Sequence, residues 1–244
     1  LQKYPRLTMG PLTKEVENKW SNYIGTKRSI FLNSGSSANL MMVYLGLISG
    51  KIKKGDKVIV PACGWATTIS PIIQLGLEPI MVDANQYNYG LNIQEVKRIC
   101  NNEDIRGMIF VHVLGVPNQK DEILEIKEKY NLYLMEDCCA SVGAQYSDGT
   151  KIGGVGDVSS FSFYFGHQLS TIEGGFVNTS DEDLYQTMLM LRSHGWTKDI
   201  SKEKYNQIIE EWNIDRINEP FNFITTGFNL RSTDLQAFLG INQI

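Results

Sequence analysis

Short apolar runs alternate with amphipathic segments along this chain, and this alternation limits the number of folds it can adopt. Strands are predicted over 28–33, 56–62, 78–84, 105–113 and 131–137, and helices over 36–50, 66–76, 93–100 and 120–130. The strands are β-branched and apolar throughout, which is typical of parallel strands covered by helices on both faces. We therefore predict an α/β fold with a doubly wound, mostly parallel sheet, whose ligands bind at the carboxyl ends of the strands.

The overall charge and composition exclude several classes of protein. The net charge of -4 comes without a basic stripe, so we expect no binding to nucleic acid. No apolar run is long enough to span a bilayer, and the first twenty residues contain no apolar signal-peptide region. The cysteines lack the CxxC spacing of a metal site, so we expect no metal. We expect buried thiols and a location in the reducing cytoplasm. They are Cys63, Cys100, Cys138 and Cys139.

Two turns that follow predicted strands could bind a ligand. Small residues surround Gly35 and Ser36 at the predicted start of a helix, where backbone amides can hold a phosphate. Trp65 follows the next predicted strand, where an indole can stack on a planar ring. Each feature taken alone has a structural interpretation as well: a serine that caps a helix, and a half-buried core tryptophan.

The other candidate groups are two acids and two histidines. Glu136 and Asp137 end a predicted strand, and because neighbouring strand residues point to opposite faces, they must serve different purposes. One carboxylate facing a crevice there would suit a protonated ring nitrogen. His112 lies within an apolar strand and His194 near a predicted helix end, so we interpret both as structural.

Read in order, several segments resemble the DegT/DnrJ/EryC1 family. They include NSGSSANL, PACGWATTISPIIQLGLEPIMVDAN, EDCCASVGAQYSDGTKIGGVGDVSSFSF, EGGFVNTSD and GFNLRSTDLQAFLGINQ. The resemblance implies the aspartate aminotransferase fold (fold type I), a pyridoxal phosphate cofactor and nucleotide-linked 4-keto sugars as substrates. It also implies that Gly35, Ser36 and Ser162 hold the cofactor phosphate, that Trp65 stacks on the pyridine ring and that Asp137 pairs with its nitrogen.

The same resemblance implies a homodimer with its active site at the subunit interface. In the family, an asparagine at the position of Asn229 usually reaches the phosphate of the neighbouring subunit. Arg231, two residues further on, could bind a diphosphate, although a salt bridge at the interface is the simpler interpretation.

His167 departs from the pattern of the family's aminotransferases, which carry a lysine at this position that bonds covalently to the cofactor. No lysine occurs between Lys151 and Lys198 that could take its place. An imidazole forms no such stable bond, but it transfers protons near neutral pH. The resemblance assigns this replacement to the sugar 3-dehydratases. One branch of these carries an iron–sulfur cluster on a later cysteine-rich stretch, and residues 176–244 here contain no cysteine. The cluster-free branch is therefore favoured.

The function implied is removal of the C3 hydroxyl from a nucleotide-linked 4-keto-6-deoxy sugar, GDP-4-keto-6-deoxy-D-mannose in particular. Such a reaction serves colitose and O-antigen (lipopolysaccharide) biosynthesis. His167 would be the acid and base, pyridoxamine phosphate the working form of the cofactor and glutamate the amino donor. Two alternatives stay open: a sugar aminotransferase whose lysine has been replaced by histidine, and a non-catalytic protein of the same fold.

Three regions are expected along the chain. Residues 1–25 form an N-terminal segment, and residues 26–197 form the large domain that binds pyridoxal phosphate. Residues 198–244 form a connecting segment and the start of a small C-terminal domain, which we expect to be largely absent from this chain.

Overall fold

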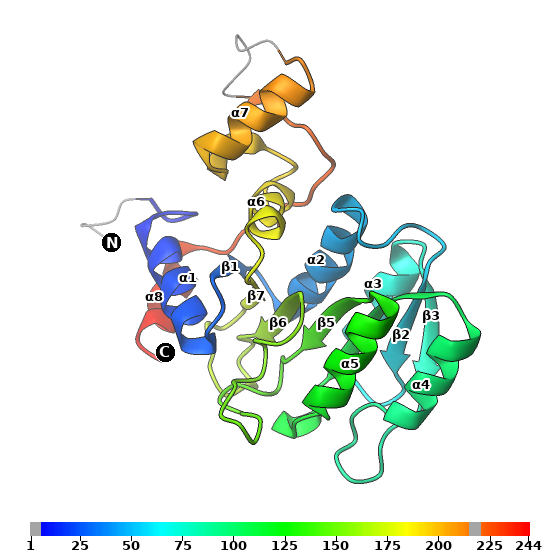
Figure 1. Ribbon diagram of the computed structural model, residues 1–244. Helices are drawn as coiled ribbons and strands as arrows, with labels where there is room; N and C mark the ends of the chain where they lie inside the picture. Colours follow the sequence, from blue (N-terminus) through cyan, green and yellow to red (C-terminus); the bar gives the residue numbers. More distant parts are fainter. Residues whose placement is uncertain (1–5, 215–220) are drawn as a thin grey trace.

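Seven strands form one mixed sheet in the order β1-β7-β6-β5-β4-β2-β3 (Figure 1). The computed structural model describes residues 6–214 and 221–244. The strands are β1 Arg28–Leu32, β2 Lys57–Pro61, β3 Glu78–Val82, β4 Ile105–Val111, β5 Tyr133–Asp137, β6 Val158–Ser162 and β7 Gly175–Thr179. Pairing is parallel from β3 through β2, β4 and β5 to β6, whereas β7 lies antiparallel to both β6 and β1. The predicted mostly parallel sheet is confirmed, with β7 as its reversed strand.

Helices connect the strands in the expected order. They are α1 Pro11–Ile24, α2 Gly35–Ile48, α3 Ala66–Gln74, α4 Ile93–Asn102, α5 Lys120–Tyr130, α6 Glu182–Leu191, α7 Lys202–Glu211 and α8 Asp234–Ile241, with short 3₁₀ turns at Val113–Gly115 and Thr197–Asp199. Polar side chains begin several of them: Ser34 accepts the Ser37 amide at the start of α2, and Asn92 accepts two amides at the start of α4. The strands and helices predicted between 28 and 137 are thus confirmed, with ends that differ by a few residues.

Helices cover both faces of the sheet, which explains the apolar runs in β2 and β4. Val58 and Val60 of β2 pack in one core with residues of α2, α3 and α6. Ile59, between them, packs in a second core with residues of α4 and α5. A third core joins α1 and α8 to β6 and β7 around the buried Trp20. Side chains that alternate along one strand therefore enter opposite apolar layers.

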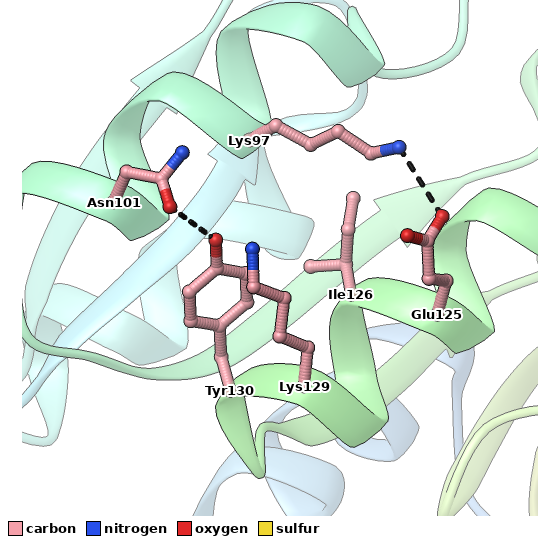
Figure 2. Close-up of a pocket in the computed structure, with 6 residues that line it drawn as sticks. All are labelled: Lys97, Asn101, Glu125, Ile126, Lys129 and Tyr130. Carbon is pink, nitrogen blue, oxygen red and sulfur yellow. Dashed lines mark hydrogen bonds and ion pairs between the residues drawn. The ribbon is translucent and has the colours of Figure 1, made fainter.

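The outer sides of α4 and α5 are joined by polar contacts (Figure 2). Lys97 Nζ lies 3.2 Å from Glu125 Oε2, and the Tyr130 hydroxyl donates to Asn101 Oδ1 over 2.6 Å. The hollow between the two helices measures about 80 Å³. Ligand pockets usually measure roughly 300–1,000 Å³, so this hollow is too small to hold a cofactor.

The N-terminal and connecting regions are described only in part. Residues 1–5 of the expected N-terminal segment, where the signal-peptide expectation also falls, lie outside the described residues, as do residues 215–220 of the expected connecting segment. The boundaries at 25 and 197 stay predictions. Among the described helices, none has the length and apolar character needed to cross a membrane.

A buried ion pair fastens α1 to the sheet and to the end of α6. Glu17 Oε1 lies 2.5 Å from Arg192 Nη1 and accepts the Phe31 amide over 2.9 Å. The same guanidinium nitrogen donates to the Phe31 carbonyl over 3.3 Å. Both charged side chains are buried, so removing one partner leaves the other as an unpaired charge in a medium of low dielectric constant.

We expect Glu17→Ala to lower the free energy of unfolding by about 3–5 kcal/mol, because Arg192 would then be buried without its counter-ion. Urea denaturation followed by circular dichroism measures this change. Glu15→Ala, on the exposed side of the same helix, is the control and should stay within about 0.5 kcal/mol of the wild type. Equal losses in the two variants would contradict the stabilising role of the ion pair.

Candidate active site

The carboxyl ends of the parallel strands meet around a cavity of about 670 Å³. Residues from the ends of β1, β2, β4, β5 and β6 line it, as the doubly wound topology predicts. Six of the site residues predicted from the sequence lie in its wall: Gly35, Ser36, Trp65, Asp137, Ser162 and His167. Because β7 runs in the opposite direction, the segment that enters it also lies at this edge, and Glu173 joins the lining.

The first turn of α2 forms one end of the cavity together with the end of β6. A Cβ atom added to Gly35 would lie only 2.4 Å from Cβ of Ser162, so the helix approaches the strand as closely as glycine permits. Ser34 caps the helix, and its hydroxyl accepts the Ser37 amide over 3.1 Å. The free amides of a 14-residue helix begin here, beside the Ser36 and Ser162 side chains that line the cavity, which suits an anion such as a phosphate.

Asp137, at the end of β5, is held by donors from three segments. Its Oδ2 accepts from Asn39 Nδ2 at 2.9 Å and from Thr68 Oγ1 at 2.6 Å, and its Oδ1 accepts the Cys139 amide at 3.1 Å. Ser160 Oγ donates to Asn39 Oδ1 over 2.5 Å and so fixes which end of that amide faces the carboxylate. Three donors thus face this carboxylate, an arrangement that suits a cation or a protonated ring nitrogen in the cavity.

Asn39, Thr68 and Ser160 were not identified from the sequence. The available signal was weak, because each is an uncharged polar residue inside a helix or strand, and each is now buried. Only the meeting of α2, α3 and β6 around Asp137 gives them a common role.

Glu136 points away from the cavity, as the alternation along β5 predicts. Its carboxylate lies 3.2 Å from His112 Nε2 and accepts the backbone amides of Gly153, Val155 and Gly156. Burial acts to raise the pKa of Glu136, but the hydrogen bonds from His112 and these amides outweigh it and lower the pKa. Asn118 donates its amide to His112 Nδ1, so we assign the ring proton to Nε2. The structural interpretation of His112 agrees with these contacts.

His112, Glu136 and Cys138 could in principle hold a metal ion, since their ligand atoms all lie within 4.8 Å of one another. The carboxylate oxygens of Glu136 already accept hydrogen bonds from the protein. Burial raises the pKa of the Cys138 thiol, so the thiolate that binds metals is disfavoured. We therefore describe this cluster as a hydrogen-bonded part of the core.

His167 lies in the loop between β6 and β7, half-buried at the cavity wall. Its amide donates to the Tyr164 carbonyl over 3.0 Å, and the Tyr164 ring lies edge-on with centroids 6.1 Å apart. Burial lowers the pKa of His167, and the negative charge of Asp137 opposes this shift only in part. This shift favours the neutral imidazole, the form that can accept a proton.

Trp65 lies in the cavity wall at the start of α3, with 75% of its surface exposed. This exposure argues against the alternative interpretation of Trp65 as a half-buried core residue. Exposure at the cavity leaves its ring face available for stacking on a planar ligand.

The remaining predicted residues lie outside this cavity. Asn229 is exposed and pairs through its backbone with Ser193, and Arg231 pairs through its backbone with Leu32 at the end of β1. The contact of Asn229 with a neighbouring subunit stays a prediction. His194 follows α6 with a φ of 65° and donates its amide to the Phe228 carbonyl over 2.7 Å. It lies outside the cavity lining, in agreement with its structural interpretation.

The fold and the cavity at its strand ends define the large domain of an aspartate-aminotransferase-type enzyme. Residues 2–244 match the model of the DegT/DnrJ/EryC1/StrS aminotransferase family, and the chain belongs to this family of pyridoxal-phosphate-dependent sugar aminotransferases and dehydratases. The family predicted from the sequence is thereby confirmed.

Individual relatives are similar over almost the whole chain. GDP-4-keto-6-deoxy-D-mannose 3-dehydratase of Yersinia pseudotuberculosis is 36% identical over 239 residues, which make up 97% of this chain and 60% of that protein. A crystal structure of GDP-4-keto-6-deoxymannose-3-dehydratase, a His-to-Asn variant with bound GDP-perosamine, is 31% identical with a TM-score of 0.86 and covers 98% of this chain and 61% of its own.

A second structure of that dehydratase holds a trapped adduct of pyridoxal phosphate and glutamate. It is 31% identical to this chain with a TM-score of 0.85, covering 97% of this chain and 61% of its own. The chain thus spans about 60% of the length of the relatives it matches.

We expect Gly35→Ala to weaken the binding of pyridoxal phosphate about tenfold or more, because the new methyl group would force the first turn of α2 away from Ser162. Equilibrium dialysis against the cofactor measures the affinity. Gly154→Ala is the control, since a Cβ there would lie 3.4 Å from the Lys151 carbonyl oxygen, on an exposed turn. Unchanged affinity in Gly35→Ala would place the phosphate site elsewhere.

Proposed function

We propose that this chain carries the active site of a pyridoxal-phosphate-dependent 3-dehydratase, which removes the C3 hydroxyl of a nucleotide-linked 4-keto-6-deoxy sugar. The observation that carries the proposal is the place of the His167 imidazole in the cavity wall, on the same side of the sheet as Asp137. Among the described residues that line the cavity there is no lysine. A site without an amine has no side chain to bond covalently to an aldehyde cofactor, but it keeps an acid and base.

The cavity suits this cofactor in size and in charge. Its volume of about 670 Å³ falls within the usual range for ligand pockets. Gly35, Ser36 and Ser162 would hold the phosphate, Asp137 would pair with the ring nitrogen and Trp65 would stack on the ring. When bound, pyridoxamine phosphate would supply an amine for the C4 ketone of the sugar and a ring that accepts the electrons of a broken C–H bond.

His167 would carry out the proton transfers. As a neutral imidazole it accepts a proton from the carbon next to that amine, which requires the lowered pKa described above. The resulting imidazolium donates the same proton to the hydroxyl group at sugar C3, so that the oxygen leaves as water. Asp137, fixed by Asn39 and Thr68, keeps a negative charge where the ring nitrogen must stay protonated.

Two structures of one similar dehydratase support the choice of substrate and donor. One holds GDP-perosamine, and the other holds glutamate trapped with pyridoxal phosphate. We therefore propose a GDP-linked sugar such as GDP-4-keto-6-deoxy-D-mannose as substrate and glutamate as amino donor, within colitose and O-antigen synthesis in the cytoplasm. We also propose a homodimer in which Asn229 completes the neighbouring site.

A sugar aminotransferase whose lysine has been replaced by histidine is the second candidate. The family's own description as aminotransferases favours it. A non-catalytic protein of the same fold is the third, and the intact supports of Asp137 argue against it, because a pure binding protein does not need a buried, triply hydrogen-bonded carboxylate facing a cavity.

We expect His167→Lys to abolish dehydration and to create a covalent bond to pyridoxal phosphate. Borohydride fixes such a bond, and mass spectrometry detects it as an added cofactor mass, whereas the wild-type protein should show none. His194→Lys, outside the cavity, is the matched control and should behave as the wild type. Borohydride labelling of the wild-type protein would favour the aminotransferase, and full dehydration by His167→Lys would show that His167 is not the base.

The rate of dehydration should rise with pH and reach half its plateau below the ordinary imidazole pKa of about 6.5. The sign follows from the mechanism: only the deprotonated imidazole accepts the proton, and burial lowers its pKa, so the active form prevails at lower pH than in water. Single-turnover rates between pH 5 and pH 8, with His194→Gln as the control, measure the midpoint. A midpoint above that of free imidazole would contradict the buried neutral base.

A further inference from the structure

The loop that carries His167 is closed at its base by backbone hydrogen bonds. The Phe163 amide donates to the Gly174 carbonyl, and the Thr171 amide donates to the Phe163 carbonyl, both over 2.9 Å. On the cavity side, Gln168 Nε2 reaches the Ala140 carbonyl over 2.9 Å. These hydrogen bonds leave both backbone groups of Ser170 for other partners.

Residues of α8 supply those partners from the opposite side of the loop. Just past the end of the helix, Gln243 Oε1 accepts the Ser170 amide at 2.9 Å, and its Nε2 donates to the Ser170 carbonyl at 2.6 Å. Gln236 Nε2 donates to the Glu173 carbonyl at 2.5 Å. A Cβ on Gly240 would lie 3.1 Å from Thr171 Cγ2, so the helix packs closely against the loop.

Gln236 and Gly240 are four residues apart and so lie on one side of the helix, and Gln243 follows three residues later in the turn that ends it. Gln243 therefore satisfies both backbone groups of Ser170 as a neighbouring strand would, and Gln236 adds a contact three residues further along the loop. His167 lies three residues before Ser170, so these contacts limit how far its backbone can move.

The helix is itself fixed to α1, beside which it lies (Figure 1). The buried carboxylate of Asp234 accepts the Gly10 amide at 2.7 Å, the Thr13 hydroxyl at 2.5 Å and the Leu12 amide at 3.2 Å. Thr233 and Gln236 form a capping box at its start. A helix held this firmly can act as a fixed support for the loop.

We propose that α8 is a clamp for the loop 163–174 and that Gln243 is a positioning residue for His167. This inference rests on the proposed role of His167 as acid and base. Proton transfer requires the imidazole to approach the donor carbon within hydrogen-bonding distance, and a displacement of about 1 Å can lower a rate about 100-fold. We therefore expect the loop position to affect proton transfer more than binding of the nucleotide sugar.

The test is Gln243→Met in the full-length protein, because methionine keeps the length of the side chain and removes both hydrogen bonds to Ser170. Gln243→Glu keeps the acceptor for the Ser170 amide but loses the donor to its carbonyl, so its effects should be intermediate. Asn242→Ala is the matched control, since that exposed side chain donates to the Phe238 carbonyl within its own helix.

Two readouts separate the clamp from the chemistry. Hydrogen exchange of the peptide 164–174, followed by mass spectrometry, should be about tenfold faster in Gln243→Met and unchanged in Asn242→Ala. The kcat for dehydration should fall about 10- to 100-fold in Gln243→Met, with KM for the nucleotide sugar within about twofold of the wild type.

Unchanged exchange in Gln243→Met would overturn the clamp, and faster exchange with an unchanged kcat would overturn the positioning of His167. A loss confined to KM would also overturn it. If the protein proves not to be a dehydratase, the exchange comparison still decides whether α8 holds the loop, so the two proposals fail separately.

Discussion

The hydrogen-bonded carboxylate of Asp137 is the constraint on which the arrangement of the site depends. A buried charge is stable only where donors surround it, and here the donors come from α2, α3 and the turn after β5. These hydrogen bonds join the N-terminal parts of α2 and α3 to the end of β5. Gly35, Ser36 and Trp65 lie at the starts of the same two helices, so the contacts of Asp137 also help to place these residues around the cavity.

Glu136, on the opposite face of β5, is also a buried carboxylate surrounded by hydrogen-bond donors, but it does not face the cavity. Its partners are His112 and three amides of the segment after β5, which close the carboxylate off from solvent. Because side chains alternate between the faces of β5, these two neighbouring acids have different surroundings. One fixes the long connection between β5 and β6 against the core, and the other keeps its face toward a cavity.

His167 is supported quite differently from Asp137, and the contrast suits the roles proposed for them. The carboxylate is rigidly built into the sheet, whereas the imidazole stands on a loop held by side chains of α8 and by Gln168. Fixed donors suit the carboxylate that we propose to pair with a ring nitrogen. Partial burial suits the proposed base, because it lowers the pKa of His167 and favours the neutral imidazole, while Asp137 opposes this shift in part.

The sequence by itself determined the layers of this protein and the side of the sheet on which its chemistry lies. Apolar runs and strand alternation predicted the parallel sheet, the opposite orientations of Glu136 and Asp137, and strand ends at Gly35 and Trp65, while a histidine in place of lysine pointed to proton transfer. Only the tertiary structure revealed Asn39, Thr68 and Ser160 around Asp137, the reversal of β7 that brings Glu173 to the cavity, and the contact of Gln243 with the loop of His167. The physical reason is that hydrophobic periodicity depends only on residues close in sequence, so it predicts which face of a strand or helix a side chain occupies. The partner that meets it there, 98 residues away for Asn39 and Asp137 and 121 for Asn39 and Ser160, depends on how the layers pack.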